Sequence, residues 1–119
     1  MTAPSEAFTR GSRLTAGAEF ARVFAGADRS TDRFFTVLAR LNELARARLG
    51  LAISRKAAPL AVDRNRLRRL ARESFRHLSL ASLDYVVMAR RDAVTASKPD
   101  LRASLDRHFL RLSRRVTAS

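Results

Sequence analysis

The chain has 119 residues, of which 46% are hydrophobic, and a formal charge of +13 from 24 lysines and arginines against 11 carboxylates. This length allows one compact domain, and the hydrophobic content can fill a core, which disfavours wholesale disorder. With no cysteine and two histidines, disulfides, thiolate zinc sites and a histidine-rich metal centre are excluded as well. The N-terminus has no apolar signal segment and no apolar run nears the ~20 residues that span a bilayer, which predicts a cytoplasmic protein.

The first half of the chain is predicted to form a tail, a helix and two strands. Residues 1–12 are small, polar and basic, which indicates a flexible tail ahead of a single domain over residues 13–116. Apolar side chains spaced three and four apart predict a helix over residues 15–27. Residues 34–39 and 48–54 are rich in branched and aromatic side chains, and they predict two strands that pair as an antiparallel hairpin.

The second half adds two helices and a strand, and one further short strand fits near residues 29–33 or 57–62. A helical period begins after Asp63, a good N-cap residue, and a last helix opens with a Ser-x-x-Asp capping box at Ser97. Residues 84–89 are apolar on both faces, which predicts a buried central strand. The expected apolar stripes of the two helices are Leu67, Leu70, Ala71, Ser74, Phe75 and Leu78, then Leu101, Leu105, Phe109 and Leu112. The whole set predicts an α+β two-layer sandwich, with a small mixed, mostly antiparallel sheet and three helices.

The positive charge is concentrated in one stretch. Between Ser54 and Arg76 there are eight cations and two carboxylates, nearly half of the net charge of the chain. Such a balance favours a nucleic-acid partner over an anionic membrane or a basic surface with no partner. All the cations except Lys56 and Lys98 are arginine, which grips phosphate with a planar fork. A bias in the coding composition of the genome would give the same preference.

The most informative strings are RNRLRRLARESFR at residues 64–76 and LGLAISRK at residues 49–56. Together they resemble the protein subunit of bacterial ribonuclease P, whose family has an Arg-Asn-Arg motif that opens a basic helix. The strings EFARVF at 19–24, RFF at 33–35 and DYVVMAR at 84–90 are similar to further family features in the same order. Before its Arg-Asn-Arg motif this chain has seven residues without glycine, where many members have six with one.

The resemblance implies a fold, a function and partners. The fold would be that of the second domain of ribosomal protein S5, with the order αβββαβα. The function would be to assist a catalytic RNA in the endonucleolytic removal of the 5′ leader from precursor tRNA. The implied partners are the ribonuclease P catalytic RNA and precursor tRNA, with neither DNA nor membrane. The ribonucleoprotein would require Mg²⁺, and the protein alone would bind no cofactor or metal.

The resemblance also implies two sets of binding residues. The first set would bind the catalytic RNA: Ser54, Arg55, Lys56, Arg64, Asn65, Arg66, Arg68, Arg69, Arg72 and Arg76. The second set would line a cleft for the leader: Arg13, Phe20, Arg22, Phe24, Arg33 and Phe35. Phe20 and Phe24 are equally compatible with a place in the core.

No pattern in the sequence predicts an active site within the chain. His77 and His108 have no matched partner, and the carboxylates are too scattered for a two-metal site. A structural RNA-binding protein of the ribosome shares the size and charge, and remains the alternative. A DNA-binding regulator is disfavoured, because a predicted strand on each side of the basic helix leaves no helix–turn–helix pair.

Overall fold

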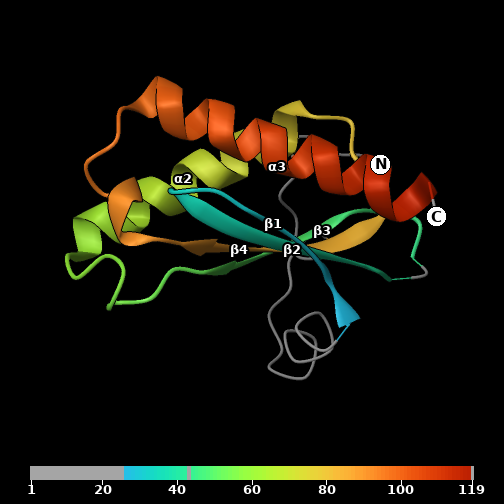
Figure 1. Cartoon of the computed structure of the whole chain (residues 1–119), viewed down its shortest axis with the longest axis horizontal. Helices are drawn as coiled ribbons and strands as arrows, with labels where there is room; N and C mark the ends of the chain where they lie inside the picture. The colour runs from blue at the N-terminus through green and yellow to red at the C-terminus, as the bar shows by residue number, and fades with distance from the viewer. Residues whose placement is uncertain (1–25, 43, 119) are drawn as a thin grey trace.

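A two-layer α+β domain forms in the computed structural model, which describes residues 26–42 and 44–118. Helices α2 and α3 lie together on one face of a four-stranded sheet (Figure 1). The described elements are β1 (Asp28–Thr31), β2 (Phe35–Leu41), β3 (Arg48–Ala52), α2 (Ala61–His77), β4 (Leu83–Ala89), a short 3₁₀ helix η2 (Arg91–Ala93) and α3 (Lys98–Ala118). The predicted strand near residues 29–33 is confirmed as β1, and the predicted helix over residues 15–27 falls almost entirely outside the described residues.

The strand order in the sheet is β1-β2-β4-β3. β2 pairs antiparallel with β1 and with β4, whereas β3 pairs parallel with β4. The predicted hairpin between the strands now seen as β2 and β3 is therefore wrong, because β4 separates them. β4 is buried at its first five positions, and a strand that is apolar on both faces gains most from a central place in the sheet.

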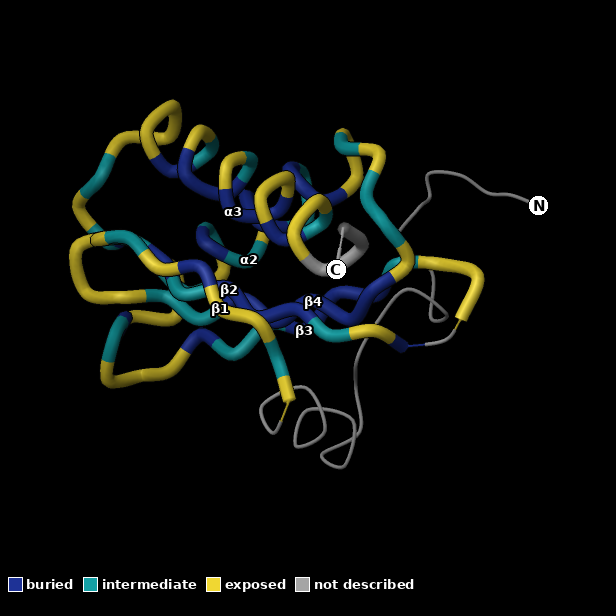
Figure 2. The backbone as a smooth tube through the Cα atoms, turned by 45° about the vertical axis from the view of Figure 1, so that its right-hand side comes forward, coloured by how far each residue is buried: buried dark blue, intermediate teal, exposed yellow. Residues whose placement is uncertain are grey.

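The core lies between the sheet and the two helices. The predicted stripe of α3 is confirmed, since Leu101, Leu105, Phe109 and Leu112 are all fully buried. Figure 2 shows this buried side of α3 turned toward the sheet and its exposed side turned away. In α2 the buried residues are Leu67, Leu70, Ala71, Ser74 and Phe75, as its period predicts, whereas Leu78 follows the end of α2 and is half-buried. The rings of Phe75, Tyr85 and Phe109 meet edge to face, with centroids 5.7–6.0 Å apart, and join both helices to β4.

The two helices begin differently. The Ser97 hydroxyl accepts a hydrogen bond from the Asp100 backbone N–H at 3.2 Å, which confirms the predicted cap of α3. α2 begins at Ala61, after an extended Leu60 that offers no side-chain cap. The prediction that Asp63 is the N-cap is therefore wrong. Asp63 lies inside the first turn, where its negative charge still suits the positive end of the helix dipole.

The other face of the sheet carries a smaller apolar cluster. Leu38 and Val86 are buried there, with Ala27, Ala52 and Met88 packed against them. On the same face the buried Arg48 and Asp84 lie opposite each other in the register of β3 and β4. Among the described residues, no helix is long and apolar enough to cross a membrane.

Candidate nucleic-acid interface

The described part of the chain has a basic surface on α2 and the turn before it. It comprises the ten residues predicted to bind RNA, and we call it the α2 basic surface. Ser54, Arg55, Lys56, Asn65, Arg69 and Arg76 are exposed, and Arg64, Arg66, Arg68 and Arg72 are half-buried. None of these side chains belongs to the buried stripe of α2. The structure therefore brings the predicted residues together on the side of α2 that faces away from the core.

The N-terminal end of this surface is held by its own side chains. The Ser54 hydroxyl accepts the Ala57 backbone N–H at 3.1 Å, which closes the turn that presents Arg55 and Lys56. The Arg64 guanidinium donates to the carbonyls of Ala58 and Pro59 at 2.9 and 2.8 Å. These bonds fix the seven-residue connection that has no glycine, because Arg64 satisfies two carbonyls left free by the turn.

Three further residues of the surface also have contacts within the chain. The Arg68 guanidinium donates to the Asn65 side-chain oxygen at 3.0 Å, one helical turn away. The Arg66 guanidinium reaches the Ala96 carbonyl at 3.0 Å and so ties α2 to the segment before α3. Arg66 therefore has a structural role in addition to its charge.

Of the six residues predicted to bind the leader, Arg33 and Phe35 lie among the described residues, and Arg13, Phe20, Arg22 and Phe24 fall outside them. Phe35 is fully buried, because the side-chain alternation of β2 turns it toward the helices. The prediction that Phe35 contacts the leader is therefore wrong.

Arg33 is exposed and lies beside a pocket of about 260 Å³ that it lines with Arg90, Arg91 and Asp92. Its guanidinium is 3.4 Å from the Asp92 carboxylate and 5.4 Å from the centre of the Phe34 ring. Three cations and one carboxylate leave this pocket positive. Arg90 and Arg91 were not predicted as site residues. The signal for them in the sequence is the pair of arginines directly after a buried strand, which places positive charge at that end of the sheet.

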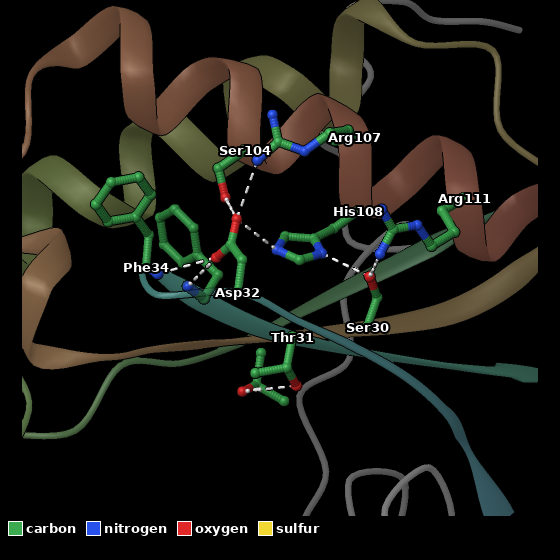
Figure 3. Close-up of polar contacts among 10 residues, drawn as sticks. Ser30, Thr31, Asp32, Phe34, Ser104, Arg107, His108 and Arg111 are labelled. Atoms are coloured by element: carbon green, nitrogen blue, oxygen red, sulfur yellow. Dashed lines mark hydrogen bonds and ion pairs between the residues drawn. The ribbon is translucent and has the colours of Figure 1, made fainter.

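A polar cluster joins β1 to α3 (Figure 3). His108 is buried, with Nδ1 2.7 Å from the Ser30 hydroxyl and Nε2 3.2 Å from the Asp32 carboxylate. The prediction that His108 has no partner is therefore wrong. Burial lowers the pKa of His108, and the neighbouring Asp32 only partly opposes this shift.

Asp32 is held ionised by the same cluster. Burial alone would raise the pKa of Asp32, but hydrogen bonds from the Ser104 hydroxyl and the Phe35 and Phe34 backbone N–H groups hold it well below its usual range. The Ser–His–Asp sequence of contacts has the form of a hydrolase triad. However, Ser30 is only 3% exposed, and its hydroxyl also accepts an N–H from Arg111 at 3.1 Å. A substrate has no access to this hydroxyl, so the cluster serves to dock α3 on β1.

The comparisons with known proteins agree with this geometry. Residues 8–113 match the family model of ribonuclease P. The chain belongs to the ribonuclease P protein family. It is 51% identical to the ribonuclease P protein component of Methylococcus capsulatus over 94% of this chain and 89% of that protein. The structure of the Staphylococcus aureus RNase P protein covers 88% of this chain and 97% of its own length, with a TM-score of 0.79 and 28% identity. For the RNase P protein from Thermotoga maritima the TM-score is 0.73 at 29% identity, over 87% of this chain and 96% of that protein.

A ribonuclease P protein is an accessory subunit of an endoribonuclease that works with the ribonuclease P RNA, and this chain shares that role. The described residues contain no group of three or more histidines and carboxylates that could hold a metal ion. What they do offer is positive charge: the α2 basic surface and the pocket beside Arg33.

Proposed function

We propose that the α2 basic surface binds the ribonuclease P RNA. The observation that carries this proposal is that four cations of this surface have no negatively charged partner among the described residues. Arg55, Lys56, Arg69 and Arg76 are exposed and have no hydrogen bond or ion pair among the described residues. The carboxylate on the second half of α2, Glu73, lies 3.7 Å from Arg102 of α3 and so points away from them. Four unpaired cations on one surface attract phosphates and release counterions from RNA on binding.

The N-terminal end of α2 adds to this surface. The first backbone N–H groups of a helix lack partners within the helix, and with the helix dipole they favour an anion. Arg64 and Asn65 lie in this first part of α2, beside the turn that presents Arg55 and Lys56. Phosphate oxygens of a folded RNA would accept hydrogen bonds from both the backbone and the guanidinium forks.

The second part of the proposal concerns the 5′ leader of precursor tRNA. The positive pocket beside Arg33 supports a phosphate contact there, and Phe34, half-buried under the Arg33 guanidinium, adds an aromatic surface. Arg13, Phe20, Arg22 and Phe24 stay in the proposal on the family resemblance alone. Aromatic stacking suits a leader of variable sequence, because every base has a π-face.

Both contacts lead to one mechanism. Held on the catalytic RNA, the protein would retain the leader and so favour precursor tRNA over mature tRNA, which lacks it. Its charge would lower phosphate repulsion and thus the Mg²⁺ concentration that cleavage needs. The RNA and substrate would hold the Mg²⁺ and carry out the hydrolysis, and the protein would hold no cofactor. We propose further that it acts in the cytoplasm as one domain over residues 13–116, without DNA or membrane partners. Its helix over residues 15–27 would complete the three-helix fold of the second domain of ribosomal protein S5.

The test is cleavage of a 5′-extended precursor tRNA at low Mg²⁺ with the ribonuclease P RNA alone, the protein alone, and both. We expect strong cleavage only in the mixture. The double variant Arg69→Gln/Arg76→Gln should restore the need for high Mg²⁺, whereas Lys98→Gln, an exposed residue at the start of α3, should behave as the unchanged protein. Cleavage by the protein alone, or no effect of the protein at any Mg²⁺ concentration, would contradict the proposal.

A further inference from the structure

A second set of cations lies at the opposite edge of the helical layer, on α3. Arg107, Arg111 and Arg115 are all exposed and follow one another at intervals of four residues, which places them in a row about 12 Å long on one side of the helix. We call this set the α3 arginine row. α3 contacts β1 and β2, whereas α2 contacts α3 and β3. The row therefore runs along the β1 edge of the domain, away from the α2 basic surface.

Each guanidinium of the row is fixed by a bond to the β1 segment. Arg111 donates to the Ser30 hydroxyl at 3.1 Å, and Arg115 donates to the Arg29 carbonyl at 3.0 Å. Arg107 contacts the Asp32 carboxylate at 3.2 Å. Figure 3 shows Arg107 and Arg111 reaching down from α3 toward these partners. Each of these bonds uses one terminal nitrogen, and a guanidinium has five N–H donors in a planar fork.

These bonds position the row without neutralising it. The partners of Arg111 and Arg115 are neutral oxygens. The Asp32 carboxylate is shared, because it also accepts hydrogen bonds from the Ser104 hydroxyl at 2.6 Å and from two backbone N–H groups. Arg102 of the same helix differs, since it lies between the carboxylates of Glu73 and Asp106 at 3.7 and 3.4 Å. The helix dipole accounts for a cation at Arg115, which lies in the last turn of α3. It does not account for Arg107, because the effect fades within the last turn and Arg107 lies well before the end of α3 at Ala118.

From this arrangement we infer that the α3 arginine row is a second RNA-binding surface, which contacts the sugar–phosphate backbone of an RNA segment distinct from the one at α2. Fixed guanidiniums lose little side-chain entropy when they bind, and a fork matches the geometry of phosphate oxygens. An anionic membrane fits less well. The apolar stripe of α3 is wholly buried in the core, whereas a membrane-surface helix inserts such a stripe into the lipid.

This inference rests on the RNA-binding function proposed above. The RNA segment that contacts the row has two possible sources with the same chemistry: a further part of the ribonuclease P RNA, or the body of the bound precursor tRNA. Two measurements on the full chain distinguish them. One is binding of the protein to ribonuclease P RNA alone over a series of salt concentrations. The other is binding of precursor tRNA to the preassembled ribonucleoprotein over the same series.

The principal variant is Arg111→Gln/Arg115→Gln. A phosphate contact contributes about 0.9 to the slope of log affinity against log salt, which is roughly fivefold in affinity at 0.15 M salt. We therefore expect this variant to bind about 25-fold more weakly in one of the two measurements, with the slope reduced by about two. Arg111→Lys/Arg115→Lys, which keeps the charge, should recover most of the affinity. If the circular dichroism spectrum shows that Arg111→Gln/Arg115→Gln is not folded, Arg115→Gln alone tests the same surface, with an expected loss of affinity of roughly fivefold.

The control is Lys98→Gln, which removes one charge from the other end of α3 and should change affinity less than twofold. If Lys98→Gln and Arg115→Gln lost the same amount of RNA affinity, the net charge of the protein alone would explain the effect, and the inference would be overturned. Unchanged affinity and slope of the double variant in both measurements would also overturn it. The inference would also be overturned if the double variant bound RNA as the unchanged protein does but no longer sedimented with phosphatidylglycerol vesicles, because the row would then contact a membrane. Arg69→Gln/Arg76→Gln, measured in parallel, reports on the α2 basic surface, so failure of the proposed function is seen separately.

Discussion

Arg48 and Asp84 lie opposite each other on β3 and β4 and are joined by two hydrogen bonds of 2.8 Å, which Nε and Nη2 along one edge of the guanidinium donate to the two carboxylate oxygens. Asp84 also accepts the Asn42 side-chain amide at 2.9 Å. Since Asn42 and Arg48 stand at the two ends of the connection between β2 and β3, this buried carboxylate fixes that connection to β4. The ion pair thus explains how β2 and β3 are held on opposite sides of one central strand.

Loss of Arg48 should destabilise the domain strongly. Arg48→Gln leaves the Asp84 carboxylate buried without its charged partner, which costs about 3–5 kcal/mol in the free energy of unfolding. The matched control is Arg33→Gln, which breaks an ion pair whose side chains are 72% and 58% exposed and should cost at most about 1 kcal/mol. Urea denaturation of both variants measures the difference. Similar small losses in the two would contradict the role given to the buried pair.

His108 should make stability depend on pH near neutrality. Burial holds the folded-state pKa of His108 below its ordinary value of 6.5, so the unfolded chain takes up a proton first as the pH falls. The free energy of unfolding should therefore decrease from about pH 7 downward, by at most about 1.4 kcal/mol per pH unit for this one proton. Asp32 acts in a different window: its lowered pKa contributes stability above its unfolded-state pKa of about 3.9, which is lost only at more acidic pH.

Thermal denaturation between pH 5 and 7.5 tests this prediction with two variants. His108→Gln should be less stable at pH 7.5 but should show a flatter pH dependence than the unchanged protein. The pH profile of the unchanged protein is the reference, and His77→Gln, at an exposed histidine at the end of α2, is the matched control for the loss of one imidazole. If His108→Gln kept the reference profile, the pH dependence would have to come from another group.

Hydrophobic period was enough to predict most of the fold. The stripes of α2 and α3 and the buried strand β4 follow from local spacing, because each element must turn its apolar side chains to the same core. The basic surface of α2 was equally visible, since charges left out of a stripe emerge on the other side of the helix. Local spacing carries no information on which strands pair, so the position of β4 between β2 and β3 could not be read from it.

The missed site features depend on contacts between residues far apart in the chain. His108 meets Ser30 and Asp32 only because α3 packs across β1, some 75 residues away in sequence. Phe35 illustrates another limit of local pattern: β2 begins at Phe35, which is fully buried, whereas the neighbouring Phe34 is half-buried against the same core. Which of two adjacent aromatic rings is fully buried depends on packing against the helices, which the sequence pattern of the strand does not contain.

The unsatisfied start of α2 predicts a stabilising substitution. Leu60 is 62% exposed and has the extended backbone of an N-cap residue, but it offers no hydrogen-bonding side chain. Leu60→Ser would place a hydroxyl within reach of the backbone N–H groups at the start of α2 and should raise the free energy of unfolding by about 1 kcal/mol. Leu41→Ser is the control, because Leu41 is 61% exposed but ends a strand and has no such groups to cap. An equal change in both variants would show that removal of an exposed leucine, not capping, is responsible.

The contribution of the α2 basic surface should also be measurable as a salt dependence of binding to the ribonuclease P RNA. Arg69 and Arg76 are exposed and have no partner among the described residues, so each substitution with glutamine should leave the free energy of unfolding within about 0.5 kcal/mol. Each should nevertheless weaken binding to the ribonuclease P RNA roughly fivefold at 0.15 M salt and reduce the slope of log affinity against log salt by about 0.9. Filter binding over a salt series of roughly 0.1 to 0.5 M measures both the affinity and the slope. A loss of affinity with an unchanged slope would mean that these arginines shape the surface without contacting phosphates.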